Sequence, residues 1–153
     1  MEGSFSHWKK WIDRNTIEGI DFPGVYALAI SSVDMSDCSF AWQREIVYIG
    51  MTNSKGGLKS RLMQFDNTIH HKEGHGGARR FLKKYPEPIS LMERLYVSVC
   101  SQGRQLSWNS PLNLRLKGDV ASYEYECMAE YYDEFGQLPE FNDKQRSPKE
   151  RWE

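Results

Sequence analysis

Gly24-Val25-Tyr26-Ala27-Leu28-Ala29-Ile30 and Glu45-Ile46-Val47-Tyr48-Ile49-Gly50 are the two segments with the strongest strand pattern in this sequence. Both are rich in β-branched and aromatic residues, a composition typical of strands. Pro23-Gly24 breaks the chain at the start of the first stretch, and the mostly polar residues 31–44 connect it to the second. The sequence therefore predicts two consecutive strands, each of which carries a tyrosine.

Outward from these strands, apolar spacings of three and four predict helices over residues 57–68 and 78–85. A short N-terminal helix is expected over residues 5–15, with Trp8, Trp11 and Ile12 on one face. These helices flank the two strands in the chain.

A third strand is expected over residues 89–100, and a long helix from Asp119, as its N-cap, to Phe135, with Gly136 as its stop. The predicted fold class is α/β (α+β), with a three-stranded, mostly antiparallel sheet flanked by helices. We expect one domain over residues 1–153, with a core over about residues 22–142 and a charged tail over residues 143–153.

Composition excludes several classes of protein. Hydrophobic residues make up 39% and aromatic residues 13% of the 153 residues, which indicates a globular chain. No apolar run is long enough to span a membrane, and the N-terminus lacks the pattern of a signal peptide. Three scattered cysteines are typical of thiols in a reducing compartment. We therefore expect a cytoplasmic protein without a membrane partner.

Charge is unevenly distributed along the chain, although the net charge is only −1. Residues 119–143 are strongly acidic, whereas residues 55–84 are strongly basic. A local basic surface can bind phosphates even when the net charge is near zero. The basic side chains of residues 55–84 are Lys55, Lys59, Arg61, Lys72, Arg79, Arg80, Lys83 and Lys84.

Six sequence features, in order along residues 23–142, together resemble the GIY-YIG nuclease superfamily. The first two are the tripeptides Gly24-Val25-Tyr26 and Tyr48-Ile49-Gly50, which resemble the two halves of the signature with Val for the first Ile. The others are Arg61, His75-Gly76-Gly77, Glu124 and the closing segment Leu138-Pro139-Glu140-Phe141-Asn142.

This resemblance implies a compact, stand-alone endonuclease that hydrolyses DNA phosphodiesters with one divalent metal ion, Mg²⁺ with Mn²⁺ able to substitute. We expect a small nuclease of the restriction or the phage and mobile-element kind, in which Glu124 would be the metal ligand. Arg61 then holds the scissile phosphate, Tyr26 is the general base and Tyr48 contacts the phosphate or water. The sequence does not rank the two tyrosines.

The same resemblance implies catalytic and binding roles around this centre. Some members carry a histidine one turn after the arginine, where this chain has Phe65, so His70, His71 or His75 could substitute; we take His75 as catalytic. The expected substrate-binding residues are Gly50, Thr52, Lys59 and Asn142.

Three glutamates of the long helix compete for the metal. Glu124 has Cys127, Met128 and Tyr131 at the helical spacings that place it beside the apolar stripe facing the sheet. Glu126 and Glu130 have polar neighbours at these spacings. The helical phase therefore favours Glu124.

Two other functions remain open. The first is a catalytically silent module that binds nucleic acid or protein on the same scaffold, and the second is a nuclease for RNA or branched DNA. The histidines and cysteines match no zinc-ligand spacing. Because cutting both strands of a duplex requires two sites, a homodimer is a further expectation.

Overall fold

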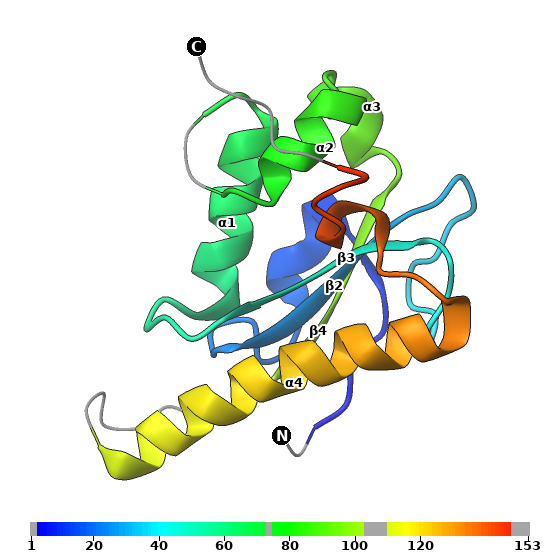
Figure 1. The fold of residues 1–153 in the computed structure, drawn as a ribbon. Helices are drawn as coiled ribbons and strands as arrows, with labels where there is room; N and C mark the ends of the chain where they lie inside the picture. Colours follow the sequence, from blue (N-terminus) through cyan, green and yellow to red (C-terminus); the bar gives the residue numbers. More distant parts are fainter. Residues whose placement is uncertain (1–2, 73–74, 103–109, 148–153) are drawn as a thin grey trace.

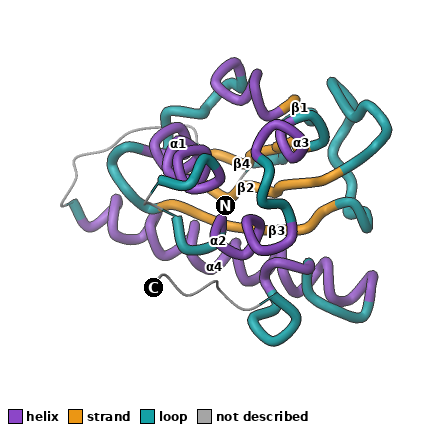
Figure 2. The backbone as a smooth tube through the Cα atoms, turned by 90° about the horizontal axis from the view of Figure 1, so that it is seen from above, coloured by secondary structure: helices purple, strands orange, loops and turns teal. Residues whose placement is uncertain are grey.

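A four-stranded antiparallel sheet is the centre of the computed structural model, which describes residues 3–72, 75–102 and 110–147. Its strands are β1 (Lys9–Lys10), β2 (Gly24–Ile30), β3 (Ile46–Thr52) and β4 (Leu95–Ser101), in the order β1-β4-β2-β3. Seen from above, they follow one another from β1 at one edge to β3 at the other (Figure 2). The α+β class is confirmed, but the sheet has four strands where three were expected.

Helices cover both faces of this sheet. Three helices, α1 (Gly57–Ile69), α2 (Ala78–Lys84) and α3 (Pro88–Met92), lie on one face, and α4 (Pro111–Phe135) crosses the other (Figure 1). Two 3-10 helices, η1 (Trp11–Thr16) and η2 (Glu140–Asn142), complete the described elements.

Strand alternation divides the core into two clusters. Tyr26 and Leu28 of β2 point to the cluster under α1, α2 and α3, whereas Val25, Ala27 and Ala29 point to the cluster under α4. Successive residues of a strand face opposite sides, so a central strand covered on both faces is apolar throughout. Tyr26 is thereby committed to the α1 side of the sheet.

The helix predicted over residues 5–15 is wrong in its first half, because only the part from Trp11 onward is helical, as the 3-10 helix η1. Trp8 is buried in the α4-side cluster and Trp11 in the α1-side cluster, while Ile12 is 66% exposed. Lys9 and Lys10 between the tryptophans pair with β4 as its edge strand. A spacing of three suits one helix face, but in an extended chain it sends two side chains to opposite faces. The backbone pairing of Lys9 and Lys10 with β4 selects the extended chain over the helix.

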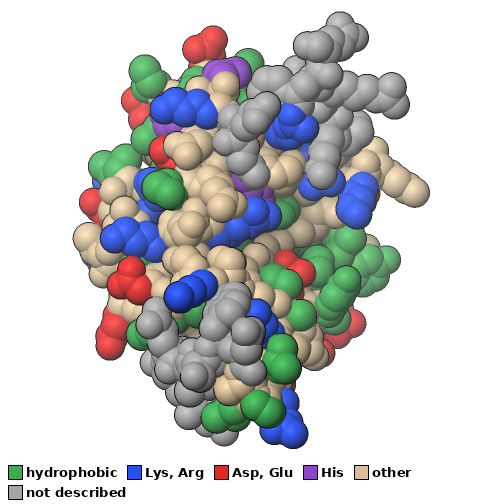
Figure 3. All heavy atoms as spheres, turned by 90° about the vertical axis from the view of Figure 1, so that its left-hand side faces the viewer, with side chains coloured by type: hydrophobic (Ala, Val, Ile, Leu, Met, Phe, Trp, Pro, Cys, Tyr) green, Lys and Arg blue, Asp and Glu red, His purple; other side chains and the backbone are tan. Residues whose placement is uncertain are grey.

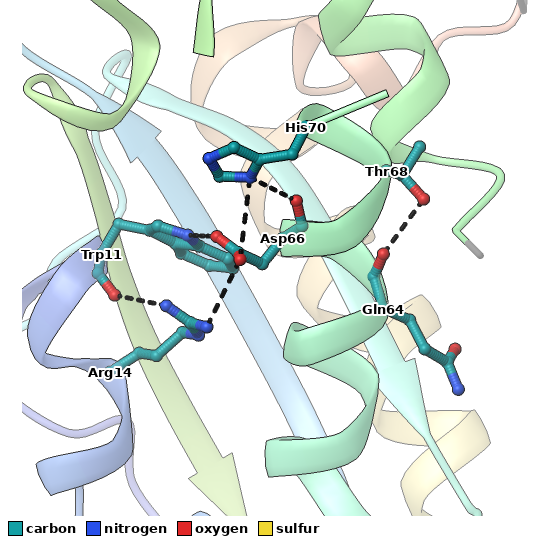
Figure 4. Close-up of polar contacts among 6 residues, drawn as sticks. All are labelled: Trp11, Arg14, Gln64, Asp66, Thr68 and His70. Atoms are coloured by element: carbon teal, nitrogen blue, oxygen red, sulfur yellow. Dashed lines mark hydrogen bonds and ion pairs between the residues drawn. The ribbon is translucent and has the colours of Figure 1, made fainter. Parts of the chain in front are cut away.

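The 3-10 helix η1 contacts α1 through a cluster of polar side chains (Figure 4). Trp11 Nε1 donates a 2.8 Å hydrogen bond to Asp66 Oδ1, and the Arg14 guanidinium lies 3.9 Å from Asp66 Oδ2. His70 approaches the same carboxylate, with Nδ1 3.7 Å from Oδ2. A buried indole N–H normally needs such a partner, so Asp66 fixes where η1 meets the helix layer.

Two other boundaries differ from expectation. The strand expected over residues 89–100 is in fact α3 followed by β4, because Pro88 at the first position favours a helical turn. The long helix begins at Pro111 rather than after Asp119, and Ser110 is its N-cap, with Oγ accepting from Asn113 N–H. Its end is as predicted, with Gly136 in the left-handed conformation at φ 71°.

The expected charged tail is partly ordered against the domain. Ser147 is buried and its hydroxyl donates to the Glu140 carbonyl, while residues 148–153 lie outside the described part. Residues 103–109 also lie outside the described part, and the chain is helical from Pro111. Within the described ranges, no helix has the length and apolar character needed to cross a membrane.

Candidate active site

Two tyrosines meet on the α1 side of the sheet. Tyr26 lies opposite Gly50 across the β2–β3 ladder, and Tyr48 lies opposite Leu28, so the two tyrosines are diagonal neighbours on one face. Their ring centroids are 6.1 Å apart. Tyr26 is fully buried and Tyr48 partly buried. The register of two adjacent strands thus brings together hydroxyls that are 22 residues apart in the chain (48 − 26).

Gly50 makes room for the first of these rings. A Cβ at this position would run into Cζ and Oη of Tyr26. The residue predicted as a substrate contact therefore has a steric role in the structure: it lets the tyrosine lie flat across the neighbouring strand.

We expect Gly50→Ala to displace the Tyr26 ring. Overpacking of this kind costs about 1–3 kcal/mol of unfolding free energy, to be measured by denaturant titration. Gly118→Ala is the matched control, because no atom lies near a Cβ at that exposed helical site, and alanine there should stabilise the protein. Equal stability of the Gly50→Ala variant and the wild type would show that the contact is easily relieved.

His75 binds Tyr26 directly from the loop before α2. Its Nε2 lies 2.7 Å from Tyr26 Oη in a buried contact. Its Nδ1 accepts hydrogen bonds from the backbone N–H groups of Gly77 at 2.9 Å and Ala78 at 3.2 Å. A ring nitrogen that accepts cannot carry a proton, so the proton of the neutral imidazole is on Nε2. His75 therefore donates to the tyrosine oxygen.

The surroundings of His75 hold the ring in this orientation. Its backbone N–H donates to Thr68 Oγ1 at 2.7 Å, and its ring packs edge-on against Phe65, with centroids 5.3 Å apart. His70 and His71 instead bond to the carbonyls of Asp66 and Pro86. Of these three histidines, only His75 contacts Tyr26.

Arg61 supplies the positive charge beside the tyrosines. It lies on α1, partly buried, and its Nη1 donates to Gln64 Oε1 at 3.0 Å. Its charge lowers the pKa values of Tyr26, Tyr48 and Glu124, so it is within electrostatic range of all three. The periodicity that predicts α1 also turns Arg61 toward the sheet.

Glu124 approaches the same place from α4, on the other side of the sheet. It is partly buried and has no hydrogen bond or ion pair with any residue in the described ranges. Burial raises the pKa of its carboxyl group, and Arg61 opposes that shift. A desolvated carboxylate without a partner is costly, which is the state expected of a ligand whose cation is supplied from outside.

The competing glutamates lie elsewhere. Glu126 is exposed, and Glu130 accepts a 2.9 Å hydrogen bond from Trp42 Nε1 on the outside of the aromatic cluster under α4. Val120, Cys127 and Tyr131 form the buried stripe of α4. The helical phase read from the sequence agrees with this arrangement.

Both tyrosines are neutral phenols in the free protein. Burial, and then the neighbouring Tyr48, raises the pKa of Tyr26 well above its usual value, and Arg61 acts against this rise. Burial and Glu124 raise the pKa of Tyr48, while Arg61 and Arg80 lower it. A phenolate at this site therefore needs more positive charge than the chain provides.

Two of the other three predicted substrate contacts, Asn142 and Thr52, bond to residues of the protein itself. Asn142 accepts from Ile49 N–H and donates to Ile49 C=O, both at 2.8 Å, so its amide ties η2 to the edge strand β3. Thr52 is buried, and its hydroxyl bonds to Ser54. Lys59 is exposed on α1. Of the three, only Lys59 keeps an available side chain.

Arg80 is a residue that the sequence did not single out. Its charge reaches Tyr48 from α2, on the side of the site away from Glu124's helix. The sequence feature that could have identified Arg80 is its place among the basic residues that follow His75. Lys and Arg side chains cross the middle of one face of the molecule, while Asp and Glu side chains lie mainly toward its edges (Figure 3).

Comparison of the chain with protein-family models found no match, and comparisons with curated proteins and with solved structures also found none. The function is therefore inferred from the residues that converge at the site: Tyr26, Tyr48, Arg61, His75 and Glu124.

Proposed function

We propose that this protein is a divalent-metal-dependent endonuclease of the GIY-YIG type that hydrolyses DNA phosphodiester bonds. One observation carries the proposal: Glu124 is a partly buried carboxylate with no hydrogen bond or ion pair among the described residues, and it lies within electrostatic range of Arg61 and both tyrosine hydroxyls. Phosphodiester hydrolysis needs these parts, namely a metal ligand, a cation for the phosphate and a proton acceptor.

The residues present suit Mg²⁺ or Mn²⁺. The described residues contain no group of three or more His, Cys, Asp or Glu side chains that could form a closed metal cage. Mg²⁺ commonly binds through one or two carboxylates and completes its shell with water and substrate phosphate. Glu124 would hold the ion. When bound, the ion supplies charge stabilisation on the phosphate oxygens.

Arg61 is proposed to bind the scissile phosphate. Its guanidinium offers five donors in a planar fork that matches two phosphate oxygens; within the described residues it bonds to Gln64 and interacts with Tyr26, which leaves further donors for a phosphate. Because the side chain is partly buried, its interaction with a phosphate is screened less than that of a surface lysine.

Tyr26 is proposed to accept the proton of the attacking water in its ionised form, after its own phenolic proton has passed to solvent. The His75 Nε2–H donor stabilises the ionised oxygen of Tyr26 and fixes its position, and Arg61 favours the same charged form. His75 does not act as the base, because its Nδ1 is occupied by two backbone donors. Tyr48 is proposed to contact the phosphate or the water.

Nucleic acid is the substrate class that the surface favours. Basic side chains cross the face shown in Figure 3, and α1 and α2, which border the site, come from the basic residues 55–84. We propose a small nuclease of the restriction or the phage and mobile-element kind. A homodimer would provide two sites for a duplex, and sedimentation at assay concentration measures it.

The test is incubation of the purified protein with supercoiled plasmid in Mg²⁺, in Mn²⁺ and in EDTA. Discrete fragments that require the metal are expected. Cleavage only of RNA or branched oligonucleotides would replace DNA duplex as the substrate. A gel shift without cleavage under any condition would favour the silent binding module and overturn the proposed chemistry.

A further inference from the structure

A second cationic pocket lies between α2 and η2. It is a cavity of about 290 Å³, and the residues that line it include Arg80, Lys83, Lys84, Glu140, Arg146 and Ser147. None of these side chains belongs to the proposed catalytic group. The pocket combines residues about 60 positions apart in the chain (140 − 80), which only the tertiary structure brings together.

Arg80 is the unusual member of this pocket. Only 9% of its surface is exposed, yet its guanidinium makes no hydrogen bond or ion pair with any residue of the described ranges. Its Nε is shielded from solvent without a partner. A buried, unpaired cation is strongly destabilising unless something compensates its charge. The described residues supply no such compensation, so the geometry favours an anion bound from outside them.

The acidic groups nearby are already neutralised. Lys84 Nζ bonds to both carboxylate oxygens of Glu140, at 2.8 and 3.1 Å. Arg146 pairs with Asp143 at 3.3 Å and donates to the Gln137 side chain and the Leu138 carbonyl. Two cations, Arg80 and the exposed Lys83, are left without a counter-charge in the described residues. The pocket therefore attracts an anion.

This pocket and the site share one helix. Phe81, next to Arg80, packs edge-on against Tyr48 with centroids 6.0 Å apart and on its other side against Phe141 of the pocket at 4.1 Å. Arg80 also lies within electrostatic range of Tyr48. An anion bound here is therefore a close neighbour of one bound at Arg61.

We propose that the Arg80 pocket binds a backbone phosphate of the nucleic acid that flanks the scissile phosphate. The proposal rests on the proposed function for the identity of its ligand. A guanidinium fork matches the oxygens of a phosphodiester, and two cationic contacts along one strand set its direction through the site.

The test is the binding of a fluorescently labelled DNA duplex in EDTA over a range of salt concentrations. Arg80→Gln is expected to weaken binding by about tenfold or more and to reduce the salt slope by about one. Lys10→Gln is the matched control, because it removes one exposed charge at the β1 edge, opposite β3. If both variants bind like the wild type, the proposal is overturned.

Two further measurements separate the possible failures. Arg80→Lys keeps the charge but loses the fork, so it should keep the salt slope and lose affinity; it also serves if Arg80→Gln does not fold. Cleavage of the plasmid in Mg²⁺ is measured in parallel. Binding that depends on Arg80 without any cleavage supports the pocket and overturns the chemistry, whereas cleavage with binding independent of Arg80 overturns only the pocket.

Discussion

Glu124→Gln is expected to lower the rate of Mg²⁺-dependent DNA cleavage by roughly 10³-fold or more, because a metal ion contributes several kcal/mol of transition-state stabilisation. The amide keeps the size of the side chain but loses the charge that attracts a hard cation. Single-turnover cleavage with excess enzyme measures the chemical step, and a Mg²⁺ titration shows whether the loss is one of metal affinity.

The same substitution is expected to leave the fold intact and to stabilise it at neutral pH. Burial raises the pKa of the Glu124 carboxyl group in the folded state above its value in the unfolded chain. The protonated Glu124 carboxyl group therefore stabilises the folded state at pH values below its unfolded-state pKa. This stability is lost as the pH rises through the folded-state pKa. A neutral amide avoids the penalty, so thermal unfolding at pH 7 should occur at or above the wild-type temperature.

Glu126→Gln is the matched control, since it removes the same charge from the exposed face of the same helix. Its cleavage rate should equal that of the wild type. If Glu126→Gln abolishes cleavage while Glu124→Gln retains it, the metal is held on the other face of α4 and the assignment of this site is wrong.

Tyr26→Phe is the second substitution with a large expected effect, a fall of about 10²- to 10⁴-fold in the cleavage rate. Phenylalanine keeps the ring that packs in the α1-side core and removes only the oxygen that contacts His75. DNA affinity in EDTA should change little, so the loss should be confined to the chemical step.

The pH dependence of the wild-type rate tests the same role. Because burial raises the pKa of Tyr26 well above its usual value, its ionised fraction at neutral pH is small and increases tenfold with each pH unit. We expect the logarithm of the rate to rise with pH without levelling near pH 7. A histidine base would instead produce a plateau above about pH 6.5.

Tyr48→Phe serves as the comparison for Tyr26→Phe, since it removes the other hydroxyl of the pair. Its loss of rate should be smaller, and the rise with pH should remain. A plateau near neutral pH that survives in Tyr26→Phe would assign the base to another group, and equal losses in both variants would leave the two oxygens acting as a unit.

Much of the fold could be predicted because it depends on local patterns. The strands β2 and β3, the helix α1 and the end of α4 at Gly136 lie where the alternation, the spacing and the left-handed glycine indicated. The start of α4 was missed although a local signal exists, a serine cap followed by Pro111. The prediction assigned the residues of the short helix α3 to the strand that follows it.

Elements that depend on distant partners were the ones predicted wrongly. Trp8 and Trp11 have the spacing of one helix face, but in the structure they flank the edge strand β1 and are buried on opposite sides of the sheet, because Lys9 and Lys10 pair with the free edge of β4. Local preference is weak compared with the burial of two indoles in two separate cores.

The local pattern of residues was sufficient to predict the elements that hold Tyr26, Tyr48 and Arg61, and the face of α4 that carries Glu124. Three features became visible only in the folded protein: His75 donates to Tyr26, the Asn142 amide bonds to the backbone of β3, and Arg80 is buried without a counter-charge among the described residues. The physical reason is that hydrogen-bond partners and burial come from segments far apart in the chain. Periodicity reports only which face of an element a residue occupies.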